Sequence, residues 1–199
     1  ADVETSLDRI TAAAQGGGLV VLSGSNPPGV PADYAGRLAA RLKKVGAGLV
    51  IDTSGAALHA VATGRHGVAL LRMDSEEAEG LAGRALPARA DTARFAASLV
   101  EAGAAQSVIV ARGSDGNVIA GADGAWIAES APVPVVSKVG AGDSFVAGFT
   151  LGHARGLPAH DALGLGSALA SAACMTPATE LCRRADADRL YAGRIVTRL

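Results

Sequence analysis

The residues best suited to chemistry are a short glycine-rich stretch followed by an aspartate. Gly140, Ala141 and Gly142 directly precede Asp143, at the start of a predicted helix over residues 143–155. Small residues there let consecutive backbone N–H groups point outward, and the helix dipole behind them favours a bound anion. A carboxylate beside a phosphate is well placed to accept a proton from an attacking hydroxyl. The alternative is that Asp143 only caps the helix and the glycines only turn the chain.

Polar, glycine-containing segments follow several short apolar runs. In a parallel α/β sheet, ligands bind at the carboxyl ends of the strands, so residues just after each run are candidates for a site. These segments cover residues 23–29, 52–55, 72–77, 112–116 and 139–144. The glycines before Asp143 are not followed by Gly-Lys-Ser/Thr, and no Gly-x-Gly-x-x-Gly follows the first predicted strand. The sequence therefore lacks both the Walker A and the dinucleotide-binding fingerprints.

Four apolar runs predict the strands of a largely parallel sheet. They cover residues 19–22, 49–51, 68–71 and 108–110. Continuous apolar runs separated by helical patterns are typical of strands buried on both faces. Helices are expected over residues 31–45, from an acidic start at 74–77, and over 91–103. In the last of these, Asp91 is the expected N-cap and Gly103 the expected stop.

The pattern changes after Gly113. Residues 117–120 and 125–128 flank a turn at 121–124 and predict a β-hairpin. An extended stretch over 133–136 follows, and residues 142–199 are expected to be almost entirely helical, with breaks at 156–158 and 176–177. No linker or charge block divides the chain, so we expect a single domain over residues 1–199.

Composition and charge exclude several classes of protein. The chain has 199 residues, 49% of them hydrophobic, with 18 basic and 19 acidic side chains and a net charge of -1. That balance gives no support for nucleic acid as the main partner. No apolar run approaches the roughly 20 residues that a membrane span needs, so no membrane partner is expected. Cys174 and Cys182 lack metal-ligand spacing and predict unpaired thiols in a reducing cytoplasm. Residues 1–10 carry four charges and no signal peptide, and the missing initiator Met suggests a processed or truncated start.

The stretch around Asp143 resembles the C-terminal signature of the PfkB, or ribokinase-like, carbohydrate kinases. Three further segments resemble the phosphofructokinase branch of that family in the same order along the chain. The tracts are Ser137-Lys138-Val139-Gly140-Ala141-Gly142-Asp143-Ser144-Phe145-Val146-Ala147-Gly148, Ser23-Gly24-Ser25-Asn26-Pro27-Pro28-Gly29-Val30, Asp52-Thr53-Ser54-Gly55-Ala56-Ala57-Leu58 and Ala178-Thr179-Glu180-Leu181-Cys182.

The resemblance implies a three-layer α/β/α fold with a mostly parallel central sheet. Family members begin with a long N-terminal portion that supplies the first strands, a small β lid and most sugar-binding residues. None of it matches here, so Ala1 is expected to fall partway through the fold. The sheet is then expected to have an exposed edge, which is a site for pairing or aggregation.

The resemblance also assigns chemical roles. Asp143 is expected to be the general base that deprotonates a sugar hydroxyl, and Gly140, Ala141 and Gly142 to form an anion hole for the transferred phosphoryl group. The Asn-x-x-Glu motif that organises Mg²⁺ and phosphates maps to Asp74 and Glu77. An alternative is that these two residues only cap a helix.

Further residues map to the nucleotide and substrate sides. Arg112 could reach a phosphate or be a solvated loop charge, and Lys138, where threonine is common, could approach phosphates or lie in solvent. Ser137 and Val139 match positions near a monovalent-cation loop. The residues mapped to nucleotide binding are Asp74, Glu77, Arg112, Gly113, Gly116, Lys138, Ser171 and Thr176, and those mapped to substrate are Ser25 and Asn26. The four histidines match no motif and are expected to be structural or exposed.

The implied function is ATP-dependent phosphorylation of a phosphorylated ketohexose, with fructose 6-phosphate favoured. Fructose 1-phosphate and tagatose 6-phosphate are the alternative substrates, and a nucleotide-binding chain without catalysis is the alternative function. ATP and Mg²⁺ are the implied cofactors, with K⁺ a further candidate. A cytoplasmic location and a homodimeric full-length parent are expected. The present chain is expected to be inactive alone, because residues that hold the sugar are missing.

Overall fold

The computed structural model describes residues 2–178 and 180–199, so Ala1 and Thr179 lie outside the described residues. The strands form a sheet in the order β1-β2-β3-β4-β5-β6-β7. The chain divides into two compact units, the first comprising the residues up to Val110 together with Ala120–Ala122, and the second Ala111–Ile119 and Asp123–Leu199. Each unit is described by itself below.

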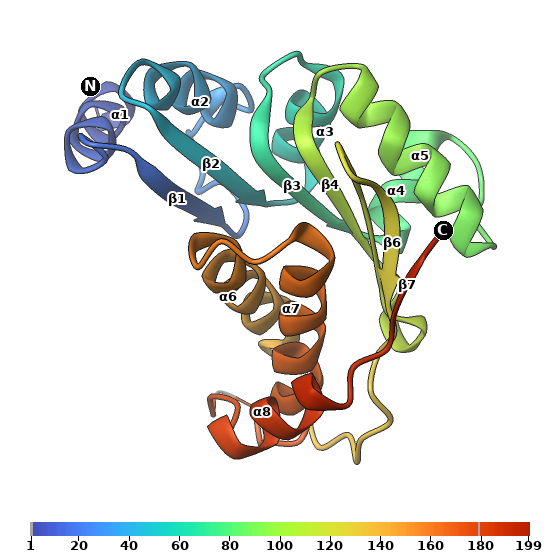
Figure 1. Ribbon diagram of the computed structural model, residues 1–199. Coiled ribbons are helices and arrows are strands. Elements are labelled where there is room, and N and C mark those ends of the chain that lie inside the picture. The colour runs from blue at the N-terminus through green and yellow to red at the C-terminus, as the bar shows by residue number, and fades with distance from the viewer. Residues whose placement is uncertain (1, 179) are drawn as a thin grey trace. The chain divides into compact units, whose positions relative to one another are not determined.

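The first unit alternates helices and strands (Figure 1). Its elements are α1 (Asp2–Ala13), β1 (Gly18–Ser23), α2 (Tyr34–Lys44), β2 (Ala47–Asp52), α3 (Gly55–Thr63), β3 (Val68–Asp74), α4 (Ser75–Ala82), α5 (Arg89–Glu101) and β4 (Ala105–Ala111). β1 pairs with β2 in parallel, and β2 with β3. The register sets Ser23 beside Asp52 and Asp52 beside Arg72. Polar residues that end adjacent strands are thereby brought to one edge of the sheet.

Burial differs between the strands of the first unit. In β2, Leu49, Val50 and Ile51 are at most 2% exposed, which confirms the predicted burial. β1 is different, because none of its residues is fully buried and Val21 is 44% exposed. The prediction that β1 is buried on both faces is therefore wrong. β1 is the first strand in the sheet order and pairs with one neighbour, so its apolar side chains lack a second covering strand.

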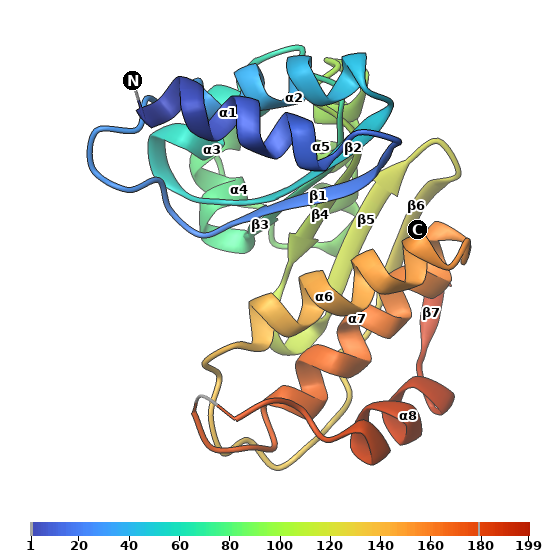
Figure 2. The ribbon, with the colours of Figure 1, turned by 90° about the vertical axis from the view of Figure 1, so that its left-hand side faces the viewer.

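The helices α1 and α2 pack against each other, as Figures 1 and 2 both show. Leu7 of α1 and Leu38 and Leu42 of α2 are fully buried. On the outer side, Arg41 of α2 forms ion pairs with Glu4 and Asp8 of α1. The two helices are thus joined by an apolar contact and a charged rim.

The second unit consists of a hairpin, three helices and a short terminal strand. Its elements are η1 (Gly113–Asp115), β5 (Asn117–Gly121), β6 (Gly124–Ala128), α6 (Ala141–Ala154), α7 (Ala159–Ala173), α8 (Arg184–Ala192) and β7 (Val196–Arg198). The helices α6 and α7 lie side by side (Figure 2). They approach closely at Gly148 and Gly166, where a Cβ on Gly148 would lie 3.0 Å from the Gly166 Cα. Glycines at this contact therefore fix the position of α6, which carries Asp143.

Most predicted elements are present, but several details were wrong. The helices α1 and α3 were not predicted, and the C-terminal segment is not all helical because β7 pairs antiparallel with β6. Asp91 is not an N-cap, since α5 begins after Ala88. Among the described residues, no helix is long and apolar enough to span a membrane.

Candidate active site

The N-terminus of α6 has the geometry of an anion site. Gly140 is its N-cap, with φ of 80° in the left-handed region that favours glycine. No side chain caps this helix start, and the first bond within the helix runs from the Ser144 N–H to the Gly140 carbonyl at 2.9 Å. The Ala141 N–H donates to the Lys138 carbonyl at 3.3 Å, and the N–H groups after it lie in the first turn, where an α-helix favours a bound anion.

Asp143 occupies the third position of α6, and its side chain is exposed. The prediction that the helix starts at Asp143 was wrong by two residues, because the left-handed Gly140 begins it earlier. Asp143 is therefore not the N-cap. A carboxylate in the first turn is stabilised by the helix dipole, at the same helix terminus where an anion is favoured.

The segment before α6 is tied to the end of α7. The N–H groups of Val136 and Ser137 both donate to the Cys174 carbonyl, at 2.8 and 3.2 Å. The Ser137 Oγ accepts from the Val139 N–H at 3.1 Å, and the Lys138 carbonyl accepts from the Ala141 N–H at 3.3 Å. The four residues before Gly140 thus form a compact turn between the two helices.

Two of the eight residues mapped to nucleotide binding, Ser171 and Thr176, lie at the end of α7 and just after it. Ser171 is 7% exposed and Thr176 is 1% exposed. The Thr176 Oγ1 donates to the Ala173 carbonyl at 2.8 Å and lies 3.2 Å from the Glu180 carbonyl. The Thr176 hydroxyl is therefore engaged by backbone carbonyls, and this residue shapes its loop.

Arg112 and the glycines after β4 form a fixed loop. The Arg112 Nε donates to the Asp115 Oδ2 at 2.8 Å, and the Arg112 side chain is 13% exposed. The interpretation of Arg112 as a solvated loop charge is therefore wrong. Gly113 accepts a bond from the Ser130 Oγ at 2.9 Å, and a Cβ on Gly116 would lie 2.2 Å from the Ala128 carbonyl oxygen. Only glycine fits at position 116.

In the first unit, Asp74 and Glu77 form a capping box at the start of α4. The Glu77 N–H donates to the Asp74 Oδ1 at 2.9 Å, and the Asp74 N–H donates to the Glu77 Oε2 at 2.9 Å. The alternative that these residues cap a helix is therefore confirmed, and each carboxylate keeps its second oxygen. Among the described residues, no three His, Cys, Asp or Glu side chains are grouped to hold a metal.

Glu77 lies among charged groups from the ends of β2 and β3. Burial raises the pKa of Glu77, and the nearby Asp74 and Asp52 act in the same direction. The bond from the Asp74 N–H and the positive charge of Arg72 oppose this rise in pKa. A divalent cation beside Glu77 would favour its charged form, so the two carboxylates fit Mg²⁺ in chemistry without enclosing it.

Asp52 and Arg72 are polar residues of this cluster to which the sequence assigned no role. The Arg72 Nη1 donates to both oxygens of Asp52, at 2.9 and 3.3 Å, and the two side chains are 16% and 13% exposed. The Arg72 Nε is buried and has no hydrogen-bond partner among the residues that the structure describes. The signal was present in the sequence, since both residues directly follow predicted strands.

The predicted substrate residues hold neighbouring loops of the first unit. The Ser25 and Ser54 hydroxyls are 2.9 Å apart, and the Asn26 Nδ2 donates to the Pro31 carbonyl at 3.2 Å. The Thr53 Oγ1 also donates to the Gly24 carbonyl at 2.9 Å. The loops after β1 and β2 are thus bound together at the carboxyl ends of their strands.

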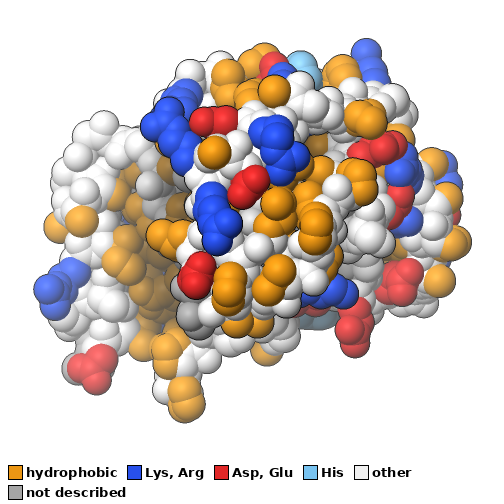
Figure 3. Space-filling view, turned by 90° about the horizontal axis from the view of Figure 1, so that it is seen from below, with side chains coloured by type: hydrophobic (Ala, Val, Ile, Leu, Met, Phe, Trp, Pro, Cys, Tyr) orange, Lys and Arg blue, Asp and Glu red, His pale blue; other side chains and the backbone are white. Residues whose placement is uncertain are grey.

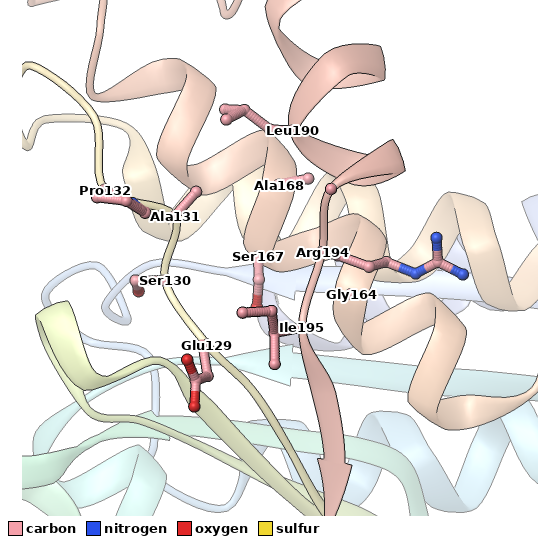
Figure 4. A pocket seen from close by; sticks show the side chains of 11 residues that line it. Glu129, Ser130, Ala131, Pro132, Gly164, Ser167, Ala168, Leu190, Arg194 and Ile195 are labelled. Carbon is pink, nitrogen blue, oxygen red and sulfur yellow. The ribbon is translucent and has the colours of Figure 1, made fainter.

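A cavity of about 100 Å³ lies beside α7 in the second unit. In Figure 4, the segment from Glu129 to Pro132 lies on one side, and Ser167 and Ala168 of α7 lie opposite. The Ser167 Oγ accepts from the buried Asn117 Nδ2 at 2.9 Å. Neither residue was singled out in the sequence, although a polar side chain at the start of an apolar strand was a signal for Asn117.

The remaining histidines and cysteines have ordinary surroundings. His160 stacks on Trp126 at 4.5 Å between ring centroids, and His153 stacks on Phe149 at 6.3 Å. Cys174 and Cys182 are free thiols, as predicted. In the face shown in Figure 3, basic and acidic side chains are interspersed, in line with the net charge of -1.

Comparison with known proteins places this geometry in a family. The pattern of the pfkB family carbohydrate kinases matches residues 3–186. The chain is 36% identical over 191 residues to the ATP-dependent 6-phosphofructokinase isozyme 2 of Mycobacterium tuberculosis (strain H37Rv), covering 96% of this chain and 56% of the relative. It is 34% identical over 158 residues to the 1-phosphofructokinase of Bacillus subtilis, covering 79% and 51%.

Solved structures agree with these matches. The crystal structure of phosphofructokinase-2 from Escherichia coli in complex with potassium has a TM-score of 0.88 and 30% identity, covering 96% of this chain and 61% of that one. The match confirms the predicted α/β fold with a mostly parallel sheet. The chain spans 56% and 51% of the two curated relatives above, and thus about half their length.

Proposed function

Because the chain belongs to the pfkB family of carbohydrate kinases, we propose that it is the nucleotide-binding part of an ATP-dependent sugar-phosphate kinase. The observation that carries this proposal is the start of α6. There, a left-handed glycine, N–H groups that no side chain caps, and an exposed carboxylate occur within four residues.

Each part of this helix start has a role in phosphoryl transfer. The N–H groups after Gly140 would stabilise the negative charge that develops on the transferred phosphoryl group. Asp143 would accept the proton of the sugar hydroxyl as that oxygen attacks. Little covalent chemistry is required of the protein in such a reaction, since positioning and charge stabilisation supply most of the rate.

The nucleotide base is proposed to lie against the small residues of α7. Gly164, Ser167 and Ala168 share one face of that helix and line the cavity of Figure 4. Ser171 lies one turn further along. Small side chains leave room for a planar ring. The loop of Gly113 and Gly116 is joined to the cavity by the bond from the Ser130 Oγ to the Gly113 carbonyl.

Mg²⁺ is the proposed metal, held through water or directly by the outward oxygens of Asp74 and Glu77. Bound Mg²⁺ would offset the charge of the nucleotide phosphates. The two residues are already oriented by their capping box, so their carboxylates need no reordering to face a cation.

The proposed substrate is a phosphorylated ketohexose, with fructose 6-phosphate preferred over fructose 1-phosphate. Support comes from coverage, since the 6-phosphofructokinase isozyme 2 relative matches 96% of this chain and the 1-phosphofructokinase relative 79%. Ser25 and Asn26 are the proposed substrate contacts. We further propose a cytoplasmic location and a homodimeric full-length protein.

The experiment is a nucleotide titration of the 199-residue chain, with a coupled assay in parallel. We expect saturable binding of MgATP, which Ala141→Asp weakens, and no measurable sugar phosphorylation by this chain alone. Absence of binding by a folded chain would reject the nucleotide site. Robust turnover would reject the proposal that further residues are required. Binding without turnover, even in the full-length protein, would favour the non-catalytic alternative.

A further inference from the structure

Four polar side chains line the cavity beside α7, and three of them are engaged with other groups of the chain. The Ser130 Oγ donates to the Gly113 carbonyl at 2.9 Å. The Arg194 guanidinium bonds to Asp161 at 2.7 Å, and in Figure 4 it points away from the other labelled side chains. Glu129 also takes part in a further interaction within the chain. The fourth is the one polar side chain that α7 contributes to the lining.

That fourth side chain is Ser167, and its hydroxyl keeps a proton to donate. Ser167 is 4% exposed, and its Oγ accepts from the Nδ2 of Asn117, which is 7% exposed, at 2.9 Å. Among the described residues, the Ser167 hydroxyl makes no further hydrogen bond. A hydroxyl accepts and donates at the same time, and a buried donor without an acceptor costs free energy. The proton of Ser167 is therefore available to an acceptor in the cavity.

The rest of the lining indicates what kind of molecule carries that acceptor. Gly164 and Ala168 lie beside Ser167 on α7 with little or no side chain, and Ala131 and Pro132 lie opposite them (Figure 4). The cavity has a volume of about 100 Å³. An apolar cavity of roughly 150 Å³ holds a benzene ring. The space therefore fits one edge of a planar ring and not a whole nucleotide.

We propose that Ser167 donates a hydrogen bond to a ring nitrogen of the bound purine base, and that Asn117 is the positioning residue that directs this donor. The inference rests on the proposed function, which places the base against α7. Asn117 begins β5, and its amide reaches Ser167 across 50 residues of sequence. Because the amide N–H occupies one lone pair of the Ser167 Oγ, the hydroxyl proton is directed elsewhere. A purine that lacks this nitrogen leaves the proton unpaired and binds more weakly.

The test is calorimetric titration of the 199-residue chain with MgATP and with its 1-deaza, 3-deaza and 7-deaza analogues. Each analogue replaces one ring nitrogen by a C–H group and keeps the shape of the base. The wild-type chain is expected to bind at least one analogue about 3- to 10-fold more weakly than MgATP, which corresponds to one neutral hydrogen bond. Ser167→Ala is expected to bind MgATP and that same analogue with nearly equal affinity.

Asn117→Ala tests the positioning role, because Ser167 keeps its hydroxyl and loses the amide that orients it. Asn117→Asp repeats the test with an acceptor that takes up the Ser167 proton. Both variants are expected to bind MgATP and the weakened analogue nearly equally. The ratio of two affinities measured on one variant does not depend on the fraction of the chain that is folded, so a purely structural defect leaves this ratio unchanged.

Thr150→Val is the matched control, because it removes a buried hydroxyl of α6 that does not line the cavity. It is expected to keep the wild-type ratio, and loss of the ratio in this variant too would overturn the proposal. Equal binding of MgATP and all three analogues by the wild-type chain would overturn it while leaving the nucleotide site standing. A difference that persists in Ser167→Ala would overturn the donor, and one that persists in both Asn117 variants would overturn the role of Asn117. No binding of MgATP by the folded wild-type chain would reject the proposed nucleotide site and this inference together.

Discussion

Two helix starts in this molecule are built in opposite ways. At α4, Asp74 and Glu77 satisfy each other's backbone N–H groups, so the helix start is closed by its own side chains. At α6, the N-cap is Gly140 and no side chain closes the helix start. A helix start that is already capped gains stability, whereas one left open keeps its donors for a ligand. The difference separates a mainly structural terminus from one suited to binding.

The largest expected effect comes from the carboxylate of the open helix start. In the full-length protein, Asp143→Asn is expected to lower kcat by about 10² to 10⁴ with little change in KM, because the general base acts mainly in the transition state. Asp161→Asn is the matched control, since Asp161 occupies the same third position in α7. A coupled kinase assay measures both. Turnover near the wild-type rate for Asp143→Asn would contradict the assignment of the base.

The next effect concerns charge at the same helix start. Ala141→Asp adds a carboxylate where an anion is expected to bind, and Ala141→Asn has the same size without the charge. We expect the first to weaken nucleotide binding by at least about tenfold, roughly 1.4 kcal/mol, and the second by less. Calorimetric titration with MgATP gives both affinities. Equal losses for the two variants would mean that side-chain size, and not charge, decides binding.

A smaller effect is expected at the closed helix start. Asp74→Ala removes one half of the capping box and is expected to cost about 1 kcal/mol of unfolding free energy. Asp74→Asn is the control, because asparagine caps a helix about as well as aspartate does. Urea unfolding measures both free energies. If the two variants lose the same stability, the charge of Asp74 matters more than its hydrogen bond.

The sequence predicted α6 better than it predicted the surroundings of that helix. The small residues of 140–142 indicated an anion site, because their chemistry is local and needs no knowledge of distant contacts. The contact of Gly148 with Gly166 depends on packing between two helices, and no local pattern encodes it. α3 was missed because Asp52-Thr53-Ser54-Gly55 reads as a loop, although its apolar residues Leu58 and Val61 are buried.

Asp91 was assigned wrongly and Arg112 was left with two alternatives, because two local explanations competed for each residue. Asp91 is a suitable N-cap by type, yet it lies at the third position of α5 and accepts from the Ala88 N–H at 3.1 Å. Arg112 is of a residue type that is common in solvated loops, but Asp115 holds its guanidinium in a mostly buried position. In both cases the partner lies three residues away, and residue type alone does not choose between the alternatives.

The smallest expected effect compares two acids with the same local bond. Glu77 and Asp91 each accept the backbone N–H of the N-cap residue of their helix. The pKa of Glu77 is raised, mainly by burial, whereas the bond from the Ala88 N–H lowers the pKa of Asp91, with help from Arg94. The same bond therefore coexists with opposite shifts in pKa, and the surroundings decide the sign.

These shifts predict opposite dependences of stability on pH. A raised folded-state pKa means that Glu77 contributes stability at pH values below its ordinary pKa of 4.5. This contribution is lost as the pH rises through the folded-state pKa. A lowered folded-state pKa means that Asp91 contributes stability at pH values above its ordinary pKa of 3.8. This contribution is lost as the pH falls through the folded-state pKa. Relative to wild type, the Tm of Glu77→Gln should therefore rise from acid to neutral pH, while that of Asp91→Asn should fall. Melting curves at several pH values, with carboxyl titration by NMR, measure both trends, and parallel trends for the two variants would show that the shared bond outweighs burial.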